Sequence, residues 1–165
     1  MNSADWFKGL RAALAGIEGG FQEAKDIINH SERIFLIGNG GSAAIASHIA
    51  TDFTKNGGLT ALAFNDTSLL TCYANDFGYE EVFSKAIHFH CIPDDCLIAI
   101  SSSGKSENIL NGVDQAREMG MEVITLSGFK PDNPLRFLGD VNFYVPSDSY
   151  GHVEITHLAI LHSMV

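Results

Sequence analysis

Apolar residues follow two patterns along this chain: short continuous runs, and longer stretches in which they recur at helical spacing. Short apolar runs bounded by glycine or polar residues are typical of buried strands. Five such runs predict strands over 34–37, 59–64, 97–100, 123–126 and 141–145. The helical pattern predicts helices over 43–55, 106–119 and 153–165, loops and short helices over 65–92, and one short helix within 131–139.

The alternation of short strands with helices indicates the fold class. Strands separated by helices form parallel βαβ units. We therefore expect an α/β fold, in which a doubly wound, five-stranded parallel sheet is the middle of three layers. Such folds bind ligands beyond the carboxyl ends of their strands, so the turns that follow the strands are the first places to look for function.

The N-terminal segment has its own apolar pattern. Residues 4–29 repeat apolar side chains at helical intervals, with a break at Gly19-Gly20. This predicts an N-terminal helical arm over 1–31, in front of an α/β core over 32–165. With no linker or internal repeat between them, the 165 residues are expected to form a single domain.

Charge and hydropathy limit the partners. Ten Lys and Arg stand against twenty Asp and Glu, giving a formal net charge of −10, which argues against nucleic acid and anionic membranes as partners. No apolar run approaches the ~20 residues that span a bilayer, and the first residues do not resemble a secretory signal.

The three cysteines are Cys72, Cys91 and Cys96, an odd number without a CxxC pair. This is typical of reduced thiols in a cytoplasmic protein. His88 and His90 lie near Cys91 and Cys96, but the spacing fits no familiar zinc module.

A serine-rich turn, Ser101–Ser106, lies between the third strand and the following helix. A helix N-terminus offers free N–H groups and partial positive charge, and the hydroxyls add donors, so the turn suits a phosphate group. One serine would suffice for a helix cap. Lys105 is interpreted as a solvated lysine, because the turn lacks P-loop spacing.

A second turn, Gly38–Gly41, follows the first strand, and Ser42 is expected to cap the next helix. The pattern Gly38-x-Gly40-x-x-Ala43 also matches the dinucleotide fingerprint, for which Asp66 is the available ribose-binding acid. Both turns follow strands and could face one crevice.

Two helices carry residues capable of chemistry. His48 and Asp52 are four residues apart and share a helix face, either as a metal-binding pair or as a local hydrogen-bonded pair. On the last helix, Glu154 and His162 are about 80° apart around the axis and can share a face, with His157 at the edge. The equally open alternative to a functional site is that these three residues are partly satisfied core residues and partly exposed surface residues.

Three motifs together carry a family resemblance. Gly38-Asn39-Gly40-Gly41-Ser42, Asn75-Asp76-Phe77-Gly78 and Ser101–Ser106, with the closing Glu154…His157…His162 segment, resemble the sugar isomerase (SIS) family, and within it the phosphoheptose isomerases. The resemblance extends from about Arg33 to the end of the chain, and the first 30 residues match only in helical character.

The resemblance implies functional residues. The implied phosphate ligands are Ser101, Ser102, Ser103 and Ser106, and the other implied substrate contacts are Asn39, Gly40, Gly41, Ser42, Asn75, Asp76 and Glu154. It also implies one zinc ion per subunit, held by His48, Asp52, Glu154 and His162, with Asp52 as catalytic base and His162 as its acid–base partner. Asp52 stands where the family has glutamate, and Glu154 where it has glutamine.

The implied activity is aldose–ketose isomerisation of sedoheptulose 7-phosphate to D-glycero-D-manno-heptose 7-phosphate, which supplies heptose for surface polysaccharide. Relatives form homotetramers. The alternatives are a non-catalytic SIS protein that senses phosphosugars or regulates replication initiation, and another phosphosugar isomerase.

Overall fold

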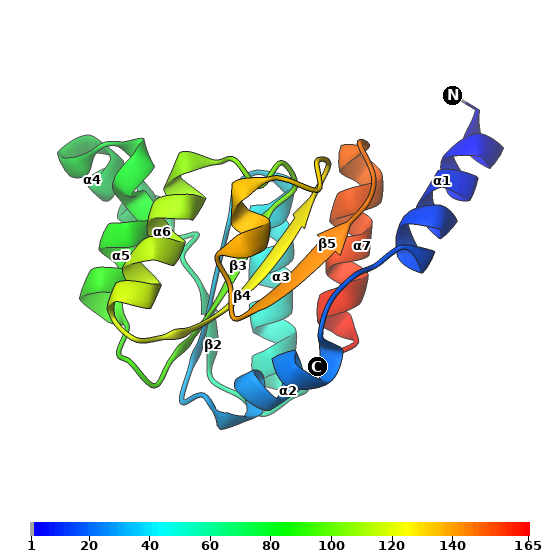
Figure 1. The fold of residues 1–165 in the computed structure, drawn as a ribbon. Coiled ribbons are helices and arrows are strands. Elements are labelled where there is room, and N and C mark those ends of the chain that lie inside the picture. Colours follow the sequence, from blue (N-terminus) through cyan, green and yellow to red (C-terminus); the bar gives the residue numbers. More distant parts are fainter. Residues whose placement is uncertain (1) are drawn as a thin grey trace.

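In the computed structural model, which describes residues 2–165, five parallel strands form one sheet in the order β2-β1-β3-β4-β5 (Figure 1). The strands are β1 (Ile34–Gly38), β2 (Ala61–Ala63), β3 (Cys96–Ser101), β4 (Glu122–Gly128) and β5 (Val141–Val145). The helices are α1 (Ser3–Ala15), α2 (Phe21–His30), α3 (Gly41–Lys55), α4 (Thr67–Phe77), α5 (Val82–His90), α6 (Glu107–Glu118) and α7 (Tyr150–His162), with short 3₁₀ helices η1 (Tyr79–Glu81) and η2 (Pro134–Phe137). The expected parallel sheet is confirmed.

Side chains of the central strands alternate between two cores. In β1, Ile34 and Leu36 pack on the side of α2, α3 and α7, whereas Phe35 and Ile37 pack on the side of α5 and α6 (Figure 1). Because successive strand residues point to opposite faces, a sheet covered on both sides needs the unbroken apolar runs seen in the sequence. The expected three-layer arrangement is confirmed.

Element boundaries differ from the expected ones at several places, most clearly in the second strand and the last helix. The second strand is only three residues long, because just Ala61–Ala63 pairs with β1, while the Leu59 N–H donates to Phe53 O at the end of α3. The last helix begins at Tyr150, three residues earlier than expected. The region 65–92, expected as loops and short helices, contains α4, η1 and α5.

The N-terminal arm consists of two helices that behave differently. Helix α2 buries Ala24, Ile27 and Ile28 against the sheet, whereas α1 buries only Ala13 and stands beside α7, away from the sheet (Figure 1). Between them, Glu18 and Tyr144 exchange two backbone hydrogen bonds of 3.1 and 2.9 Å, which form a one-residue antiparallel bridge to β5.

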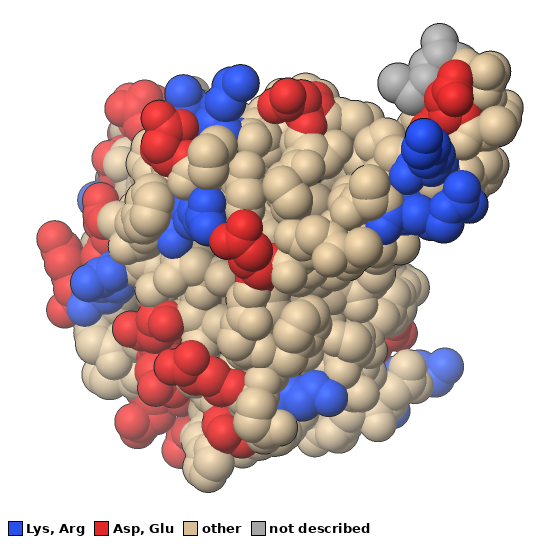
Figure 2. All heavy atoms as spheres, turned by 45° about the vertical axis from the view of Figure 1, so that its right-hand side comes forward, with Lys and Arg blue, Asp and Glu red and all other residues tan. Residues whose placement is uncertain are grey.

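On the face drawn in Figure 2, Lys and Arg side chains stand in small groups among acidic and uncharged residues instead of forming one patch. Within residues 2–165, no helix has both the length and the hydropathy needed to cross a membrane.

Candidate active site

The two turns singled out in the sequence meet at one point of the sheet. From β1 the chain continues to β2 on one side, and from β3 it continues to β4 on the other, so the strand order reverses between β1 and β3. Open α/β sheets bind ligands in the crevice at such a switch point. A cavity of about 150 Å³, the switch-point cavity, lies there, lined by Asn39, Ser42, Ile100, Ser101, Ser102, Ser103, Ser106, Tyr150 and Glu154.

The serine turn supplies hydroxyls that are free to bind a ligand. The Ser102 hydroxyl is buried and has no hydrogen-bond partner within the described residues. Ser106 occupies the N-cap position of α6, but its side chain makes no capping hydrogen bond and accepts only a long one, 3.4 Å, from Ser101 Oγ. An orphaned buried hydroxyl costs free energy unless a ligand satisfies it. The turn therefore suits a phosphate at the N-terminus of α6.

The conformation of this turn depends on Gly104. Its φ of +64° is one that side chains rarely adopt, and a Cβ there would collide with the buried Asn133 side chain. Asn133 Nδ2 donates to Lys130 O at 2.8 Å, and its Oδ1 accepts from the Arg136 N–H at 3.1 Å. The buried Asn133 side chain therefore supports the turn on the side of Gly104. Lys105 is exposed and does not line the cavity.

The turn after β1 is tied to the opposite helix. Asn39 and Asn108 exchange reciprocal amide hydrogen bonds of 2.9 and 3.0 Å, and Asn39 Oδ1 also accepts from the Tyr79 hydroxyl. The expectation that Ser42 caps α3 is wrong: Gly40 is the N-cap, because its φ of +56° turns the chain into the helix two residues earlier. Ser42 is buried in the first turn of α3 and lines the cavity.

The structure does not bring every expected contact to this cavity. Asn75 and Asp76 lie on the exposed helix α4, where Asn75 Nδ2 donates to Asp76 Oδ1 at 2.8 Å, and neither lines the cavity. Their role in substrate binding stays a prediction.

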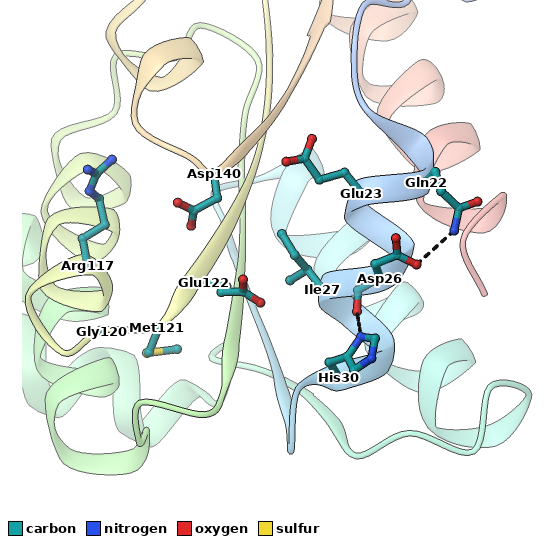
Figure 3. Close-up of a pocket in the computed structure, with 10 residues that line it drawn as sticks. All are labelled: Gln22, Glu23, Asp26, Ile27, His30, Arg117, Gly120, Met121, Glu122 and Asp140. Atoms are coloured by element: carbon teal, nitrogen blue, oxygen red, sulfur yellow. Dashed lines mark hydrogen bonds between the residues drawn. The ribbon is translucent and has the colours of Figure 1, made fainter.

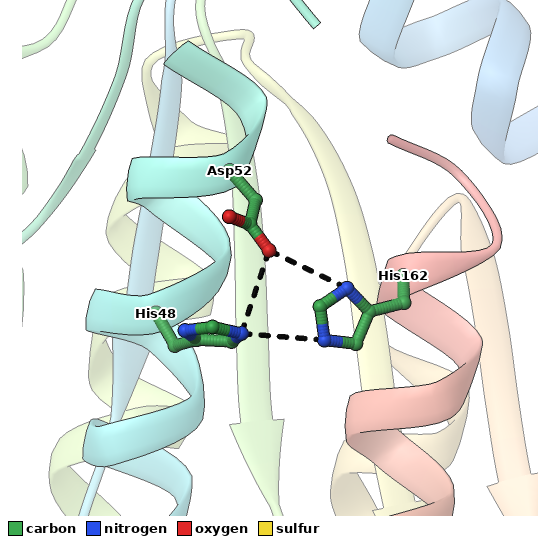
Figure 4. Close-up of side chains that lie close together, drawn as sticks. All are labelled: His48, Asp52 and His162. Carbon is green, nitrogen blue, oxygen red and sulfur yellow. Dashed lines mark hydrogen bonds and ion pairs between the residues drawn. The ribbon is translucent and has the colours of Figure 1, made fainter. Parts of the chain in front are cut away.

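A second group of chemically active side chains lies on the outer surface of α3 and α7. His48, Asp52 and His162 point toward one another and form a cluster whose donor atoms all lie within 4.8 Å, the His–Asp–His cluster (Figure 4). Asp52 Oδ2 is 3.4 Å from both His48 Nε2 and His162 Nδ1, and the two histidines approach to 3.3 Å through their Nε2 atoms. The local spacing of His48 and Asp52 did predict a shared helix face.

These three residues fit a metal ion. Two imidazole nitrogens and a carboxylate oxygen are ligands that zinc accepts, and bonds of about 2.0–2.1 Å would place two ligands of a tetrahedron roughly 3.3–3.4 Å apart. The separation of Asp52 Oδ2 and His48 Nε2 falls in that range, and one ligand atom from each of the three residues lies within 4.8 Å of the other two. The cluster can therefore hold a metal ion.

Glu154 is separate from this cluster. It lies two turns before His162 on α7, a rise of about 12 Å, and its carboxylate lines the switch-point cavity. A Cβ on Gly41 would fall 2.5 Å from Glu154 Oε1, so glycine makes room for the carboxylate there. Its assignment as a metal ligand stays a prediction, since only His48, Asp52 and His162 converge.

The third residue of the last helix, His157, is a core residue. It is fully buried, and its Nε2–H donates to Ser127 O of β4 at 3.1 Å. Burial lowers the pKa of His157 to about 4, so the ring is neutral at pH 7. It does not line the cavity, contrary to its expected place at the edge of the site.

Tyr150 lines the cavity and was missed in the sequence. Its ring packs edge-on against Phe129 at 4.7 Å between centroids, and Phe129 has a φ of +59°, the one non-glycine residue with positive φ among residues 2–165. No motif or spacing marked Tyr150, because its place depends on the conformation of the β4–η2 connection.

Other candidate sites have structural roles. Asp66 Oδ1 accepts from the Ser68 hydroxyl and the Leu69 N–H as the N-cap of α4, and these bonds lower the pKa of Asp66. Asp66 is therefore a cap, which removes the acid that the dinucleotide interpretation needed. Cys91 and Cys96 are free buried thiols outside any metal cluster of the described residues, and burial raises the pKa of Cys91 to about 12.

A larger cavity, of about 840 Å³, lies at the opposite end of the strands. Figure 3 shows its lining between α2 and the start of β4 and β5, with the carboxylates of Glu23, Asp26, Glu122 and Asp140 and a single cationic side chain, Arg117. Four carboxylates disfavour an anionic ligand. A phosphorylated ligand therefore favours the switch-point cavity.

A parallel 2-1-3-4-5 sheet with a hydroxyl-lined cavity at its switch point agrees with the architecture expected of a SIS domain. A family model described as "SIS domain" matches residues 8–128. The phosphoheptose isomerase of Helicobacter pylori strain HPAG1 is 37% identical over 143 residues, which cover 83% of this chain and 74% of that protein. That of Akkermansia muciniphila is 34% identical over 165 residues, which cover 96% and 87%.

The solved structures agree. Phosphoheptose isomerase GmhA from Neisseria gonorrhoeae superposes with a TM-score of 0.86 at 31% identity, covering 98% of this chain and 94% of that one. The chain therefore belongs to the SIS domain family and, within it, to the phosphoheptose isomerase family, whose members are isomerases.

Proposed function

We propose that this protein isomerises sedoheptulose 7-phosphate to D-glycero-D-manno-heptose 7-phosphate for surface polysaccharide synthesis. The observation that carries the proposal is that α3 and α7 each connect the switch-point cavity to the His–Asp–His cluster. Ser42 and His48 belong to α3, and Glu154 and His162 belong to α7.

The spacing of the two sites supports a long, open-chain substrate. The rise from Ser42 to His48 is about 9 Å, and from Glu154 to His162 about 12 Å. An extended chain gains roughly 1.2 Å per bond, so seven carbons with a terminal phosphate span about 9–10 Å. With its phosphate in the cavity, the substrate extends its carbonyl end toward the cluster.

The chain's own residues supply the proton transfers. The Asp52 carboxylate accepts the proton from the carbon beside the carbonyl and returns it to the neighbouring carbon. His162 donates a proton to the carbonyl oxygen and accepts one from the adjacent hydroxyl, which yields the aldose from the ketose through a cis-enediol. The serine turn holds the phosphate and thereby fixes the reacting carbons.

We also propose that His48, Asp52 and His162 hold one zinc ion per subunit. When bound, zinc supplies polarisation of the substrate oxygens and stabilises negative charge on them. The donor types and separations described above support zinc at this position.

The proposed assembly is a cytoplasmic homotetramer. Exposed apolar side chains on the arm, such as Phe7 and Leu14, support packing of α1 against another subunit. The free thiols support a reducing compartment. Light scattering tests the assembly, and a monomeric mass would contradict it.

The decisive experiment measures turnover of sedoheptulose 7-phosphate by the zinc-supplied protein and by His162→Ala. We expect activity in the unmodified protein and a loss of about 10³-fold in His162→Ala. His88→Ala, a substitution of an exposed histidine on α5, is the matched control and should retain full activity. An inactive unmodified protein with zinc bound would refute the assignment.

A further inference from the structure

The side-chain amide of Asn39 uses most of its hydrogen-bonding capacity inside the protein. A primary amide has two N–H donors and an oxygen with two acceptor lone pairs. Asn39 Oδ1 accepts from Asn108 Nδ2 at 3.0 Å and from the Tyr79 hydroxyl at 2.9 Å, so both lone pairs are used. Asn39 Nδ2 donates one hydrogen to Asn108 Oδ1 at 2.9 Å. Within residues 2–165 one N–H is left over, so Asn39 offers the switch-point cavity a donor and no acceptor.

The reciprocal pair of Asn39 and Asn108 does not fix this polarity by itself. If both amides turned over together, each would still donate to the other and accept from it. The group left over at Asn39 would then be an oxygen lone pair instead of an N–H. The Tyr79 hydroxyl distinguishes the two orientations, because a hydroxyl that donates needs an oxygen opposite it. Asn108 is buried, so its amide depends on this pairing.

Tyr79 is held in position by its neighbours and lies outside the switch-point cavity. Gly78, with a φ of +94°, turns the chain from α4 into η1, and Asn111 Nδ2 of α6 donates to Glu80 O at 3.1 Å. Tyr79 lines a neighbouring cavity of about 320 Å³, which Asn39 also lines. Because Tyr79 does not line the switch-point cavity, it acts on a ligand there through Asn39.

We propose that Tyr79 is a positioning residue, which orients the amide pair of Asn39 and Asn108 so that Asn39 donates a hydrogen bond to an acceptor oxygen of the ligand. Phosphate, ester and carbonyl oxygens of a phosphorylated sugar are such acceptors. Gly78, the last residue of the motif that begins at Asn75, thereby serves the site although Asn75 lies away from the cavity. This inference rests on the proposed function only in taking a phosphorylated sugar as the ligand.

NMR of the side-chain amides tests the orientation without any ligand. In the isotope-labelled unmodified protein, we expect a single set of amide signals from Asn39 and Asn108. Tyr79→Phe should give a second set or exchange broadening, because neither orientation is then favoured. Tyr73→Phe is the matched control: it removes a hydroxyl that lies 3.3 Å from His90 Nε2, and should leave the signals unchanged. A single, sharp set of signals in Tyr79→Phe would overturn the proposal.

Calorimetry with a heptitol 7-phosphate, which has no carbonyl to react, tests the consequence for binding. If only part of the Tyr79→Phe molecules present the N–H, the affinity falls by that fraction, and we expect a loss of about two- to fivefold. The melting temperature should stay the same, because Tyr79 is exposed and an exposed hydrogen bond contributes little to stability. Tyr73→Phe should change neither quantity. Unchanged affinity in Tyr79→Phe would overturn the role of Tyr79.

A double-mutant cycle tests whether Tyr79 acts through Asn39. In an Asn39→Ala background, Tyr79→Phe should have no further effect on binding, and an effect of the same size in both backgrounds would overturn the proposal. If the heptitol phosphate binds neither the unmodified protein nor the variants, the proposed function fails, and the amide signals decide the role of Tyr79. If binding changes as expected but sedoheptulose 7-phosphate is not turned over, the proposed reaction fails while the role of Tyr79 stands.

Discussion

The switch-point cavity and the His–Asp–His cluster differ in what holds their functional groups. In the cavity, the positions follow from backbone: a strand end, a glycine with positive φ and a helix N-terminus place the serines. In the cluster, three side chains reach one another from two helices, and His48 and His162 have 54% and 42% of their side-chain surface exposed. The backbone therefore positions the serines for one charged group before a ligand binds. The exposed side chains of the cluster need a bound ligand to hold them in one arrangement.

Replacing Asp52 with Asn is expected to have the largest effect. It tests whether the His–Asp–His cluster carries out the proton transfers. The amide keeps the shape but loses the charge and the basic oxygen that both histidines face. We expect turnover to fall about 10³-fold, with phosphate affinity unchanged. Steady-state kinetics with metal analysis measures this change.

The control for this substitution is Asp26→Asn on α2, which changes the same charge in a remote groove. Full activity of Asp52→Asn would show that proton transfer does not depend on the cluster, and the proposed difference in role between the two sites would be wrong.

The next prediction concerns His157, which lies on α7 between Glu154 and His162. It tests how burial of this histidine makes the stability of the protein depend on pH. Its pKa is about 4 in the folded protein against 6.5 for an ordinary histidine. The unfolded chain therefore binds more protons between these values, and stability falls as pH drops from about 6.5 to about 4. The loss from this group is about 3 kcal/mol.

Urea unfolding at a series of pH values measures this dependence. His157→Gln, which has no titrating ring, should show a flatter profile across the same window. Parallel profiles for the two proteins would show that His157 is not kept neutral by burial.

Ser102→Ala has the smallest expected effect. It tests phosphate binding in the switch-point cavity separately from the cluster. Because Ser102 Oγ has no partner in the described chain, its removal should leave the melting temperature equal or slightly higher. Phosphate affinity should fall about tenfold, since a hydrogen bond to a charged group is lost.

Calorimetry with inorganic phosphate and thermal unfolding provide the two readouts. Ser31→Ala, which removes a hydroxyl bonded to Ile27 O far from the cavity, is the control. A lower melting temperature with unchanged phosphate affinity would make Ser102 a structural residue.

The sequence predicted the backbone-defined site better than the side-chain site. All five strands and both turns were expected, because buried apolar runs and glycine turns are local signals. His162 was marked by its spacing to Glu154, but its association with His48 and Asp52 came only from the family resemblance, since no local spacing relates α7 to α3. Glu154 and His162 share a helix, two turns apart. The sequence could not show that this rise separates the cavity from the cluster, because the position of α7 relative to the sheet is a tertiary property.

The elements that were mispredicted have weak local signals. Helix α4 was expected only as part of loops and short helices, and none of its residues is fully buried, although Leu69, Leu70, Tyr73 and Ala74 pack partly buried against the core. The second strand is at an edge, where pairing with β1 ends after three residues. Tyr150 had no signal, because its packing partner Phe129 is brought to it by a rare backbone conformation.

The bridge between Glu18 and Tyr144 has a consequence for self-association. Free sheet edges invite pairing with strands of other molecules, and β5 is an edge strand. The α1–α2 connection occupies the N–H and the C=O of Tyr144 in the middle of that edge. The other edge, β2, is only three residues long. The α1–α2 connection therefore protects the β5 edge from strand addition by another molecule. We expect a chain that begins after Glu18 to form fibrous aggregates more readily through this edge.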